Sequence, residues 1–450
     1  MRLARRSFFA AFCGLAMTGL LANAAPVQAQ ALEGKVVIIT SFPKDLTGPY
    51  AAAFEKKYPG TKVEIQNRNT TAAVAYIRET QSNPPDLFWV SAPDAFEVLK
   101  KNKLLSQYKP KAEGIPEKVG AFPINDPEGH FFGFAASGYG IMYNSRYLQG
   151  NKLPAPKEWD DLKKPIYAGH IGISAPSRSG TTHLTVETIL QGEGWAKGWA
   201  TLLEIGGNLV TVSDRSFGVP DAVNSGQYGL GIVIDFFGLA AKASGFPVEF
   251  VYPELTTIVP ASIGIINNAK NRKAAEAFVD FILSPEGQEI LLEPKIRRLP
   301  VRPESYAKAP ADYPNPFKNT KLGAKVAFDS DLSEARYELV NSLYDRLVTF
   351  RLKELNEAWK AIHAAEAAMA KKKTPAAEKL LAEARALATT VPVSAKEAGD
   401  PAIAGAFQPV AKDKPAPARQ AQYEEQWDAF AKKNYAEAKA LAEQAAKAAK

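Results

Sequence analysis

Cysteine, histidine and recognisable catalytic motifs are scarce in this chain of 450 residues. The single cysteine is Cys13, so no disulfide is expected. The histidines show no metal-ligand spacing, which argues against a zinc site. The Gly-x-x-x-x-Gly-Lys loop of nucleotide hydrolases and the Gly-x-Ser-x-Gly elbow of esterases are also absent. We therefore expect no catalytic residues, no metal and no cofactor.

Long apolar runs are absent except near the N-terminus. A start with three arginines precedes an apolar segment over 8–21, and Ala29-Gln30-Ala31 follows as a small-x-small cleavage signal. Residues 1–31 are predicted to be an export signal, and the Arg5-Arg6 pair leaves both the general secretory and the twin-arginine route open. No later stretch reaches the ~20 apolar residues of a membrane span, so the exported chain is expected to be soluble in the periplasm.

Neither sign of charge is in marked excess. The chain has 55 basic and 48 acidic residues, and without the three arginines of the predicted signal the balance is 52 to 48. This mild positive charge does not indicate a nucleic-acid partner, but it suits a small anionic ligand. The length exceeds that of one ordinary core, so about three lobes or domains are expected.

The most informative stretch runs from Ile171 to Glu187. Apolar and small residues alternate as in a strand, Pro176 to Gly180 interrupt the pattern, and a helical run begins at Thr181. The unpaired N–H groups and the dipole at such a helix start attract an anion. The alternative is that Ser179 or Thr181 only caps the helix. The residues predicted to bind a phosphate or carboxylate here are Ser177, Arg178, Ser179, Gly180, Thr181 and Thr182.

Strands alternate with helices on both sides of this stretch, which predicts parallel α/β sheets. In such sheets ligands bind beyond the carboxyl ends of the strands. For Asp235, a role as helix cap is an equally open interpretation. The further predicted ligand-binding residues are Ser41, Lys44, Ser91, Arg215, Ser216 and Asp235.

Two extended segments, 131–144 and 258–266, are interpreted as crossings between two lobes. The first contains Gly138-Tyr-Gly-Ile-Met-Tyr-Asn144, and a later helix ends in Phe281-Ile-Leu-Ser-Pro-Glu-Gly-Gln288. With the export signal, these features resemble a periplasmic substrate-binding protein of an ABC importer. The similar branch includes iron(III)-binding proteins and those for phosphorylated sugars, phosphoglycerate and phosphonates.

The resemblance covers about residues 32–325 and implies a type II periplasmic-binding-protein fold, in which two α/β lobes close on the ligand about hinge crossings. Lobe 1 is predicted to contain 32–135 with 258–325, and lobe 2 to contain 136–257. Residues 326–450 are predicted to form an α-helical C-terminal extension with a linker at 409–419.

The resemblance also bears on the ligand. Iron binders of this branch carry adjacent tyrosines after the strand that here ends at Asp235, whereas this chain has Phe236-Phe237. Phenylalanine cannot ligate iron, so a small phosphorylated organic anion is favoured. A ferric-ion or carboxylate binder of the same fold remains the alternative.

An ABC permease of the inner membrane is the expected partner of a monomeric binding protein. From a different class, the chain could be a periplasmic sensor subunit that docks through its helical tail. A secreted phosphate-ester hydrolase would need a nucleophile or metal that the sequence does not offer.

Overall fold

The computed structural model describes residues 32–120, 122–323, 325–408 and 415–449. The predicted export signal and part of the predicted linker lie outside the described residues. Residues 32–450 form one compact unit. Within the described part of the chain, no helix is long and apolar enough to cross a membrane.

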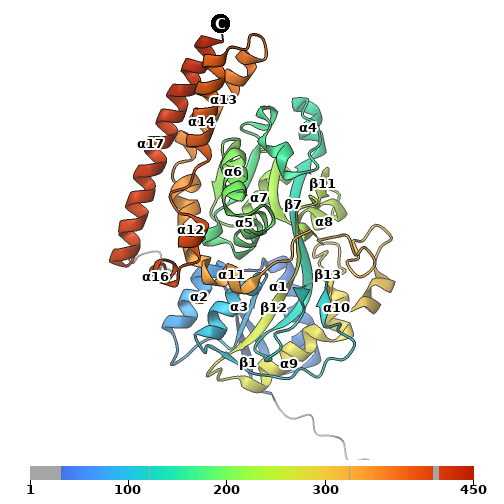
Figure 1. Ribbon diagram of the computed structural model, residues 1–450. Helices are drawn as coiled ribbons and strands as arrows, with labels where there is room; N and C mark the ends of the chain where they lie inside the picture. The colour runs from blue at the N-terminus through green and yellow to red at the C-terminus, as the bar shows by residue number, and fades with distance from the viewer. Residues whose placement is uncertain (1–31, 121, 324, 409–414, 450) are drawn as a thin grey trace, which may run out of the picture. The chain divides into compact units, whose positions relative to one another are not determined.

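The first lobe is built on β1 (Lys35–Thr40), β2 (Lys62–Asn67) and β3 (Leu87–Val90), which are parallel, with β12 (Ile258–Ile266) antiparallel to β3. Side chains on successive strand residues point to opposite faces of the sheet. Ile38 therefore packs with α1 (Lys44–Lys57) and α9 (Arg272–Leu283), whereas Ile39 packs with α2 (Thr70–Glu79) and α3 (Pro93–Lys101). The first lobe is thus a sheet covered by helices on both faces (Figure 1).

The second lobe contains β8 (Ile171–Ser174), β9 (Leu209–Ser213) and β10 (Leu230–Ile234), in the order β10-β8-β9. One face packs against α5 (Gly180–Glu193) and α6 (Trp195–Gly206), and the other against α7 (Gly218–Ser225) and α8 (Asp235–Ala243). Short elements complete both lobes: β4 (Leu105–Ser106), β5 (Lys118–Val119), β6 (Phe122–Pro123), α4 (Ser145–Asn151), η1 (Trp159–Lys163), η2 (Pro165–Tyr167), η3 (Pro176–Arg178), β11 (Val248–Val251), α10 (Pro285–Ile290), β13 (Leu299–Pro300) and η4 (Pro303–Lys308).

The long strand β7 (Phe132–Asn144) connects the two lobes. Its first half pairs with β12, and its second half pairs with β10 and β11. The backbones of β7 and β11 lie so close together that a Cβ on Gly140 would lie 2.1 Å from the carbonyl oxygen of Val251. The first predicted crossing is therefore one strand shared by both lobes, and the predicted two-lobed α/β fold is confirmed.

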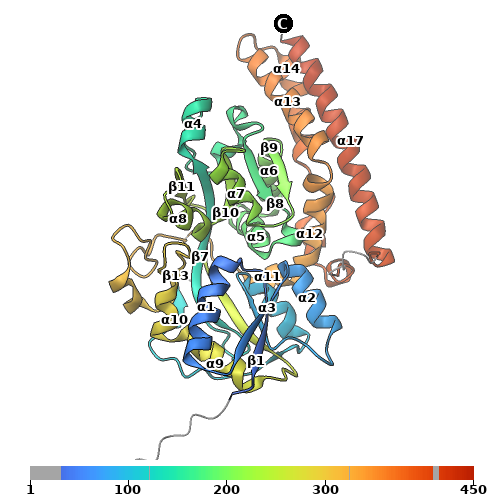
Figure 2. The same cartoon turned by 180° about the vertical axis from the view of Figure 1, so that it is seen from behind.

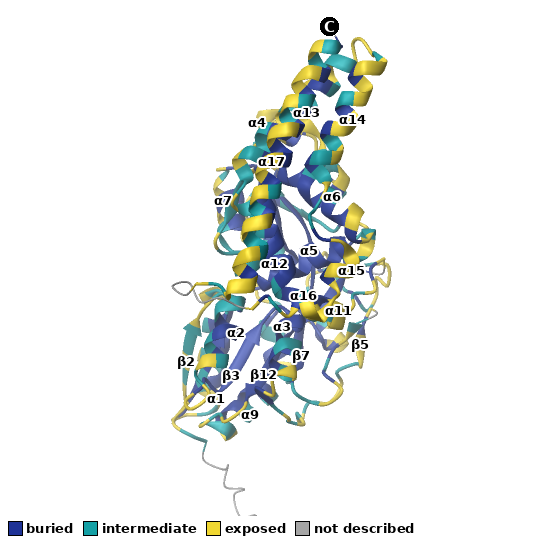
Figure 3. Ribbon diagram, turned by 60° about the vertical axis from the view of Figure 1, so that its left-hand side comes forward, coloured by how far each residue is buried: buried dark blue, intermediate teal, exposed yellow. Residues whose placement is uncertain are grey.

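A helical C-terminal extension is present, as predicted. It contains α11 (Ser330–Ala335), α12 (Tyr337–Tyr344), a π-helical turn η5 (Asp345–Thr349), α13 (Leu352–Met369), α14 (Pro375–Thr389), α15 (Ala395–Ala398), α16 (Pro401–Ala404) and α17 (Ala418–Ala448). Helices α13, α14 and α17 lie side by side in Figures 1 and 2. Buried and exposed residues alternate along α17 in Figure 3, and Trp427 and Tyr435 lie on its buried side.

The core of the extension is continuous with that of the second lobe. Leu343, Leu355 and Trp359 of the extension belong to the same buried cluster as Trp199 and Leu203 of α6. Gly207, at the end of α6, has no room for a side chain because a Cβ would lie 2.2 Å from the ring of Trp359. The extension is therefore packed as part of the second lobe.

Candidate functional site

The predicted strand, loop and helix are present at β8, η3 and α5. Ser179 caps α5, because its Oγ accepts a hydrogen bond from the N–H of Thr182 at 3.1 Å. The hydroxyl of Thr182 is bonded to Ser174 beneath the loop. The capping interpretation of Ser179 is thus correct, although a cap does not prevent the other N–H groups at the helix start from facing a ligand.

The start of α5 is pressed against the first lobe. The hydroxyls of Thr181 and Ser91 lie 2.9 Å apart and both are buried. A Cβ on Gly180 would lie 2.6 Å from Cβ of Ala92 and 3.0 Å from Oγ1 of Thr70. Four predicted site residues, Ser91 and Ser179 to Thr181, therefore meet where the two lobes touch.

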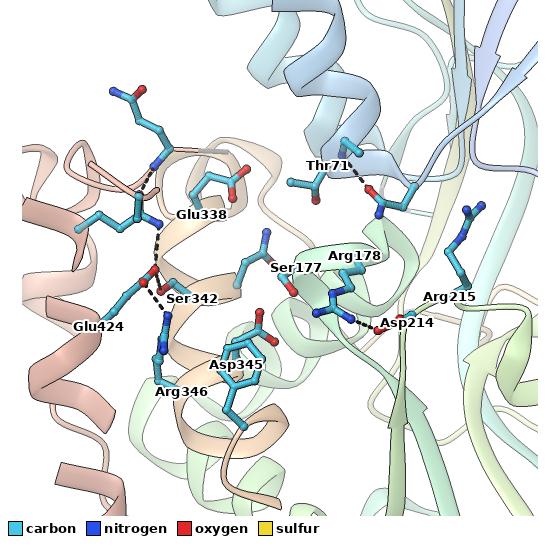
Figure 4. A pocket seen from close by; sticks show the side chains of 17 residues that line it. Thr71, Ser177, Arg178, Asp214, Arg215, Glu338, Ser342, Asp345, Arg346 and Glu424 are labelled. Carbon is cyan, nitrogen blue, oxygen red and sulfur yellow. Dashed lines mark hydrogen bonds and ion pairs between the residues drawn. The ribbon is translucent and has the colours of Figure 1, made fainter. Parts of the chain in front are cut away.

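Ser177 and Arg178 lie on the outer side of the same loop. They line a pocket of about 760 Å³ whose other walls come from α2, α12, η5 and α17. Figure 4 shows Arg178 turned towards Asp214, with which it forms an ion pair. Arg215 also lines this outer pocket and donates to Oδ1 of Asn67 at 2.8 Å. The outer pocket holds three arginines and four carboxylates, so it has no excess of positive charge for an anion.

Ser41 and Lys44 lie at the start of α1. Ser41 accepts a long hydrogen bond of 3.4 Å from Thr70. Lys44 is exposed and lines a mainly apolar groove of about 580 Å³, to which Phe42 and Phe217 contribute. Ser216 is half-buried in the neighbouring turn of the second lobe. Phe217 lines the same groove as Lys44, and Ser216 lies between Phe217 and Arg215 of the outer pocket.

Asp235 is fully buried at the start of α8. Its Oδ2 accepts from the N–H of Gly138 at 2.8 Å and from the hydroxyl of Tyr252 at 2.9 Å. Its Oδ1 accepts from the N–H of Phe236 at 2.7 Å. Burial raises the pKa of Asp235 to about 6, although the three hydrogen-bond donors act to lower it. A carboxylate has about four acceptor positions, so Asp235 has room for about one more hydrogen bond.

Arg298 is the residue that sequence reasoning missed. It is fully buried, and its guanidinium carbon lies 3.6 Å from the ring centre of Phe236 and 4.3 Å from that of Phe42. Among the described residues, none of its three guanidinium nitrogens has a hydrogen-bond partner. Burial lowers the pKa of Arg298 to about 9, which still leaves the group charged at neutral pH. No local pattern marks this arginine, because it lies between α10 and the two-residue strand β13.

Arg298 and its surroundings form a cluster between the lobes. Phe42 comes from the first lobe, and Asp235 and Phe236 come from the second. Tyr139, from the shared strand β7, is fully buried, which raises its pKa; the charge of Asp235 also raises this pKa, and that of Arg298 lowers it. We call Arg298, Asp235, Phe42, Phe236 and Tyr139 the arginine cluster. It places an unpaired cation, a carboxylate and a helix N-terminus together, as a site for an anion with hydroxyl groups would require.

Comparison with known proteins identifies the family. The model of the bacterial extracellular solute-binding proteins matches residues 82–322, more than half of the chain. The chain belongs to this family, the binding components of ABC importers. The phosphoglycerate transport regulatory protein PgtC of Salmonella typhimurium is 33% identical to this solute-binding protein over 372 residues, 82% of this chain and 89% of PgtC.

Solved structures share the fold of this solute-binding protein. The periplasmic binding protein AfuA from Actinobacillus pleuropneumoniae, with fructose-6-phosphate bound, gives a TM-score of 0.62 at 24% identity, covering 70% of this chain and 98% of AfuA. Iron-bound HitA from Pseudomonas aeruginosa gives a TM-score of 0.52 at 18% identity, covering 65% and 95%. The predicted branch, which includes both phosphate-ester and ferric-ion binders, is therefore confirmed.

Proposed function

We propose that this solute-binding protein captures a small phosphorylated organic anion in the cleft between its lobes. The observation that carries this proposal is the buried, unpaired guanidinium of Arg298. A buried charge without a partner costs several kcal/mol. A phosphate group offsets that cost because it accepts two parallel N–H bonds from one guanidinium.

The neighbouring groups suit the rest of such a ligand. Phe42 and Phe236 hold the guanidinium by its faces, which leaves its N–H edges for a ligand. Asp235 has about one acceptor position left, which suits a hydroxyl of a sugar or glycerate. Of the residues predicted from sequence, we place Ser41, Ser91, Asp235 and 179–182 along the cleft and Lys44 at its mouth. Arg178 and Arg215 are weaker candidates than Arg298, because they are bonded to Asp214 and Asn67. Ser177 and Ser216 stay predicted contacts.

Of the relatives named above, the two with the higher identity support an ester rather than iron. PgtC is named for phosphoglycerate, and the AfuA structure contains fructose-6-phosphate. In this chain Phe236 packs on Phe237 and on Arg298, and a ring held against a cation is an unsuitable place for ferric iron. We propose the periplasm as the location, a monomer as the state and an ABC permease as the partner.

A second candidate role is that of a sensor subunit, because the relative in Salmonella is named a transport regulatory protein. A membrane kinase would then detect the anion-bound form of the protein. Permease and ATPase genes beside this gene favour transport, whereas a kinase and a response regulator favour sensing.

A thermal-shift screen tests the proposed ligand class. The probes are 3-phosphoglycerate, fructose-6-phosphate, inorganic phosphate, a phosphonate and ferric citrate. A ligand that binds only the folded chain stabilises it by about 2.7 kcal/mol at a hundredfold excess over its Kd. We expect stabilisation by a phosphate ester, and stabilisation by ferric citrate alone would contradict the proposal.

A further inference from the structure

One hydroxyl of the C-terminal extension touches both lobes. Ser333, on α11, is fully buried and donates to Oδ2 of Asp94 at 2.8 Å. Asp94 lies in the first turn of α3, in the first lobe. The same Ser333 oxygen lies 3.1 Å from Nε2 of His183, in the first turn of α5, in the second lobe. The three side chains meet behind the start of α5, where Thr181 contacts Ser91.

The extension is attached to the second lobe through the segment around α12. Arg336 donates two hydrogen bonds to Glu187, at 2.9 and 2.8 Å, and both side chains are buried. Tyr337 stacks on the ring of His183 with their centres 3.9 Å apart, and Asn341 lies 2.7 Å from Nδ1 of His183. Three separate contacts therefore fix α12 to α5.

Attachment to the first lobe runs through α11, which packs along α3. It includes the bond from Ser333 to Asp94 and an ion pair between Glu334 and Lys101, whose lysine is half exposed. The exposed ion pair contributes little, because solvent screens it. The segment from α11 to α12 therefore bridges the lobes, and separating them must break its contacts with α3 or with α5.

We propose that residues 333–341 form a clasp that holds the two lobes closed and makes the C-terminal extension respond to closure. The closed form is held by the hydrogen bond from Ser333 to Asp94 and by the contact of Oδ2 of Asp94 with Nε2 of His183, 3.4 Å away, and opening exchanges both for contacts with water. The clasp continues through α12 and η5 into α13, which packs with α14 and α17. Closure thereby sets the position of the extension relative to the first lobe.

The distance between the lobes tests the clasp without any ligand. With Cys13→Ser, the pair Ser82→Cys and Gln227→Cys provides the only thiols for spin labels, on exposed positions of the first and second lobes. Ser333→Ala removes the shared hydroxyl. We expect a narrow, short distance distribution in the parent protein and a longer, broader one in Ser333→Ala.

Ser342→Ala is the matched control. It removes a hydroxyl from the adjacent helix α12, but Ser342 donates at 2.8 Å to Glu424 within the extension. Its distance distribution should equal that of the parent protein. The clasp is refuted if Ser333→Ala also equals the parent, or if both alanine variants widen the distribution alike. If Ser333→Ala does not fold by circular dichroism, Asp94→Asn takes its place, because it removes the charged acceptor of Ser333; a lengthening is again expected, and an unchanged distribution refutes the clasp.

A second measurement links the clasp to ligand capture, and it rests on the proposed function. If the clasp raises the population of the closed form, its loss lowers apparent affinity in proportion to that population. Calorimetry with 3-phosphoglycerate should show binding about tenfold weaker in Ser333→Ala than in Ser342→Ala. Equal affinities would refute the link to capture. Absence of binding to every variant would contradict the proposed ligand, while the label distances would still decide on the clasp.

Discussion

Replacing Arg298 by methionine should stabilise the ligand-free protein and abolish anion binding. Burial lowers the pKa of Arg298 from 12.5 to about 9, and each pKa unit corresponds to about 1.4 kcal/mol. The charged form is therefore disfavoured by roughly 5 kcal/mol in the folded state. The rings of Phe42 and Phe236 and the packing of the side chain stem offset part of this cost. We expect Arg298→Met to raise the free energy of unfolding by about 1–4 kcal/mol.

The same substitution should remove the main interaction with the ligand. Two hydrogen bonds from a charged donor contribute about 1.5–3 kcal/mol each. Their loss corresponds to an affinity about 10²–10⁴-fold weaker. Urea denaturation without ligand measures the first effect, and calorimetry with 3-phosphoglycerate measures the second.

Arg297→Met is the matched control for this experiment. Arg297 is the adjacent residue, but its guanidinium lies 3.8 Å from the carboxylate of Asp312 and contacts the ring of Tyr313. Its replacement should slightly destabilise the fold and leave affinity unchanged. The reasoning on Arg298 is refuted if Arg298→Met binds 3-phosphoglycerate as tightly as the parent protein. An equal loss of stability in both methionine variants would refute the claim that the buried charge is uncompensated.

Three further predictions concern other parts of the cleft. The pKa of Asp235 is raised from 3.8 to about 6 in the folded state. Its contribution to the free energy of unfolding, about 3 kcal/mol, is therefore present below pH 4 and is lost as pH rises through 6. Urea denaturation of Asp235→Asn should lack this pH-dependent component. A Cβ on Gly180 would lie 2.6 Å from Cβ of Ala92, so Gly180→Ala should hinder closure and weaken 3-phosphoglycerate binding in calorimetry by more than tenfold. Thr182→Ala should reduce the binding free energy by only about 0.5–1.5 kcal/mol. Equal effects of the two substitutions would contradict this prediction. With Phe236 and Phe237 after β10, the purified protein should be colourless, and a visible charge-transfer band with stoichiometric iron would overturn this expectation.

Local patterns predicted much of the fold because each sheet residue faces one layer of helices. The alternation around Ile171 and the break at Pro176 gave β8 and α5 in the order that the structure has. The extended segments 131–144 and 258–266, together with the resemblance, predicted the two lobes, and the structure shows the first of these segments as a strand shared by both. Within the predicted helical extension, a π-helical turn at η5 separates α12 from α13, and apolar spacing alone does not reveal such an interruption.

The candidate site was harder to predict because its decisive contacts join distant segments. Arg298 meets Phe42 and Phe236, which lie 256 and 62 positions earlier in the sequence. An arginine before a short strand is ordinarily a surface residue, and only burial reveals that its charge is unpaired. Arg178 differs from Arg298 because it was predicted to bind the ligand but has a partner within the protein. It lies in the predicted loop, yet it forms an ion pair with Asp214.

The clasp and the arginine cluster place opposite demands on the closed form. Bringing the lobes together buries Arg298 between Phe42 and Phe236, and without an anion that burial is unfavourable. Closing also brings Asp94 to Ser333, and their hydrogen bond is favourable, although it works against the burial that raises the pKa of Asp94. A ligand that pairs with Arg298 removes the unfavourable contribution and leaves the favourable one. The balance between these two buried charges therefore sets how strongly closure depends on the anion, and the C-terminal extension contributes one side of that balance.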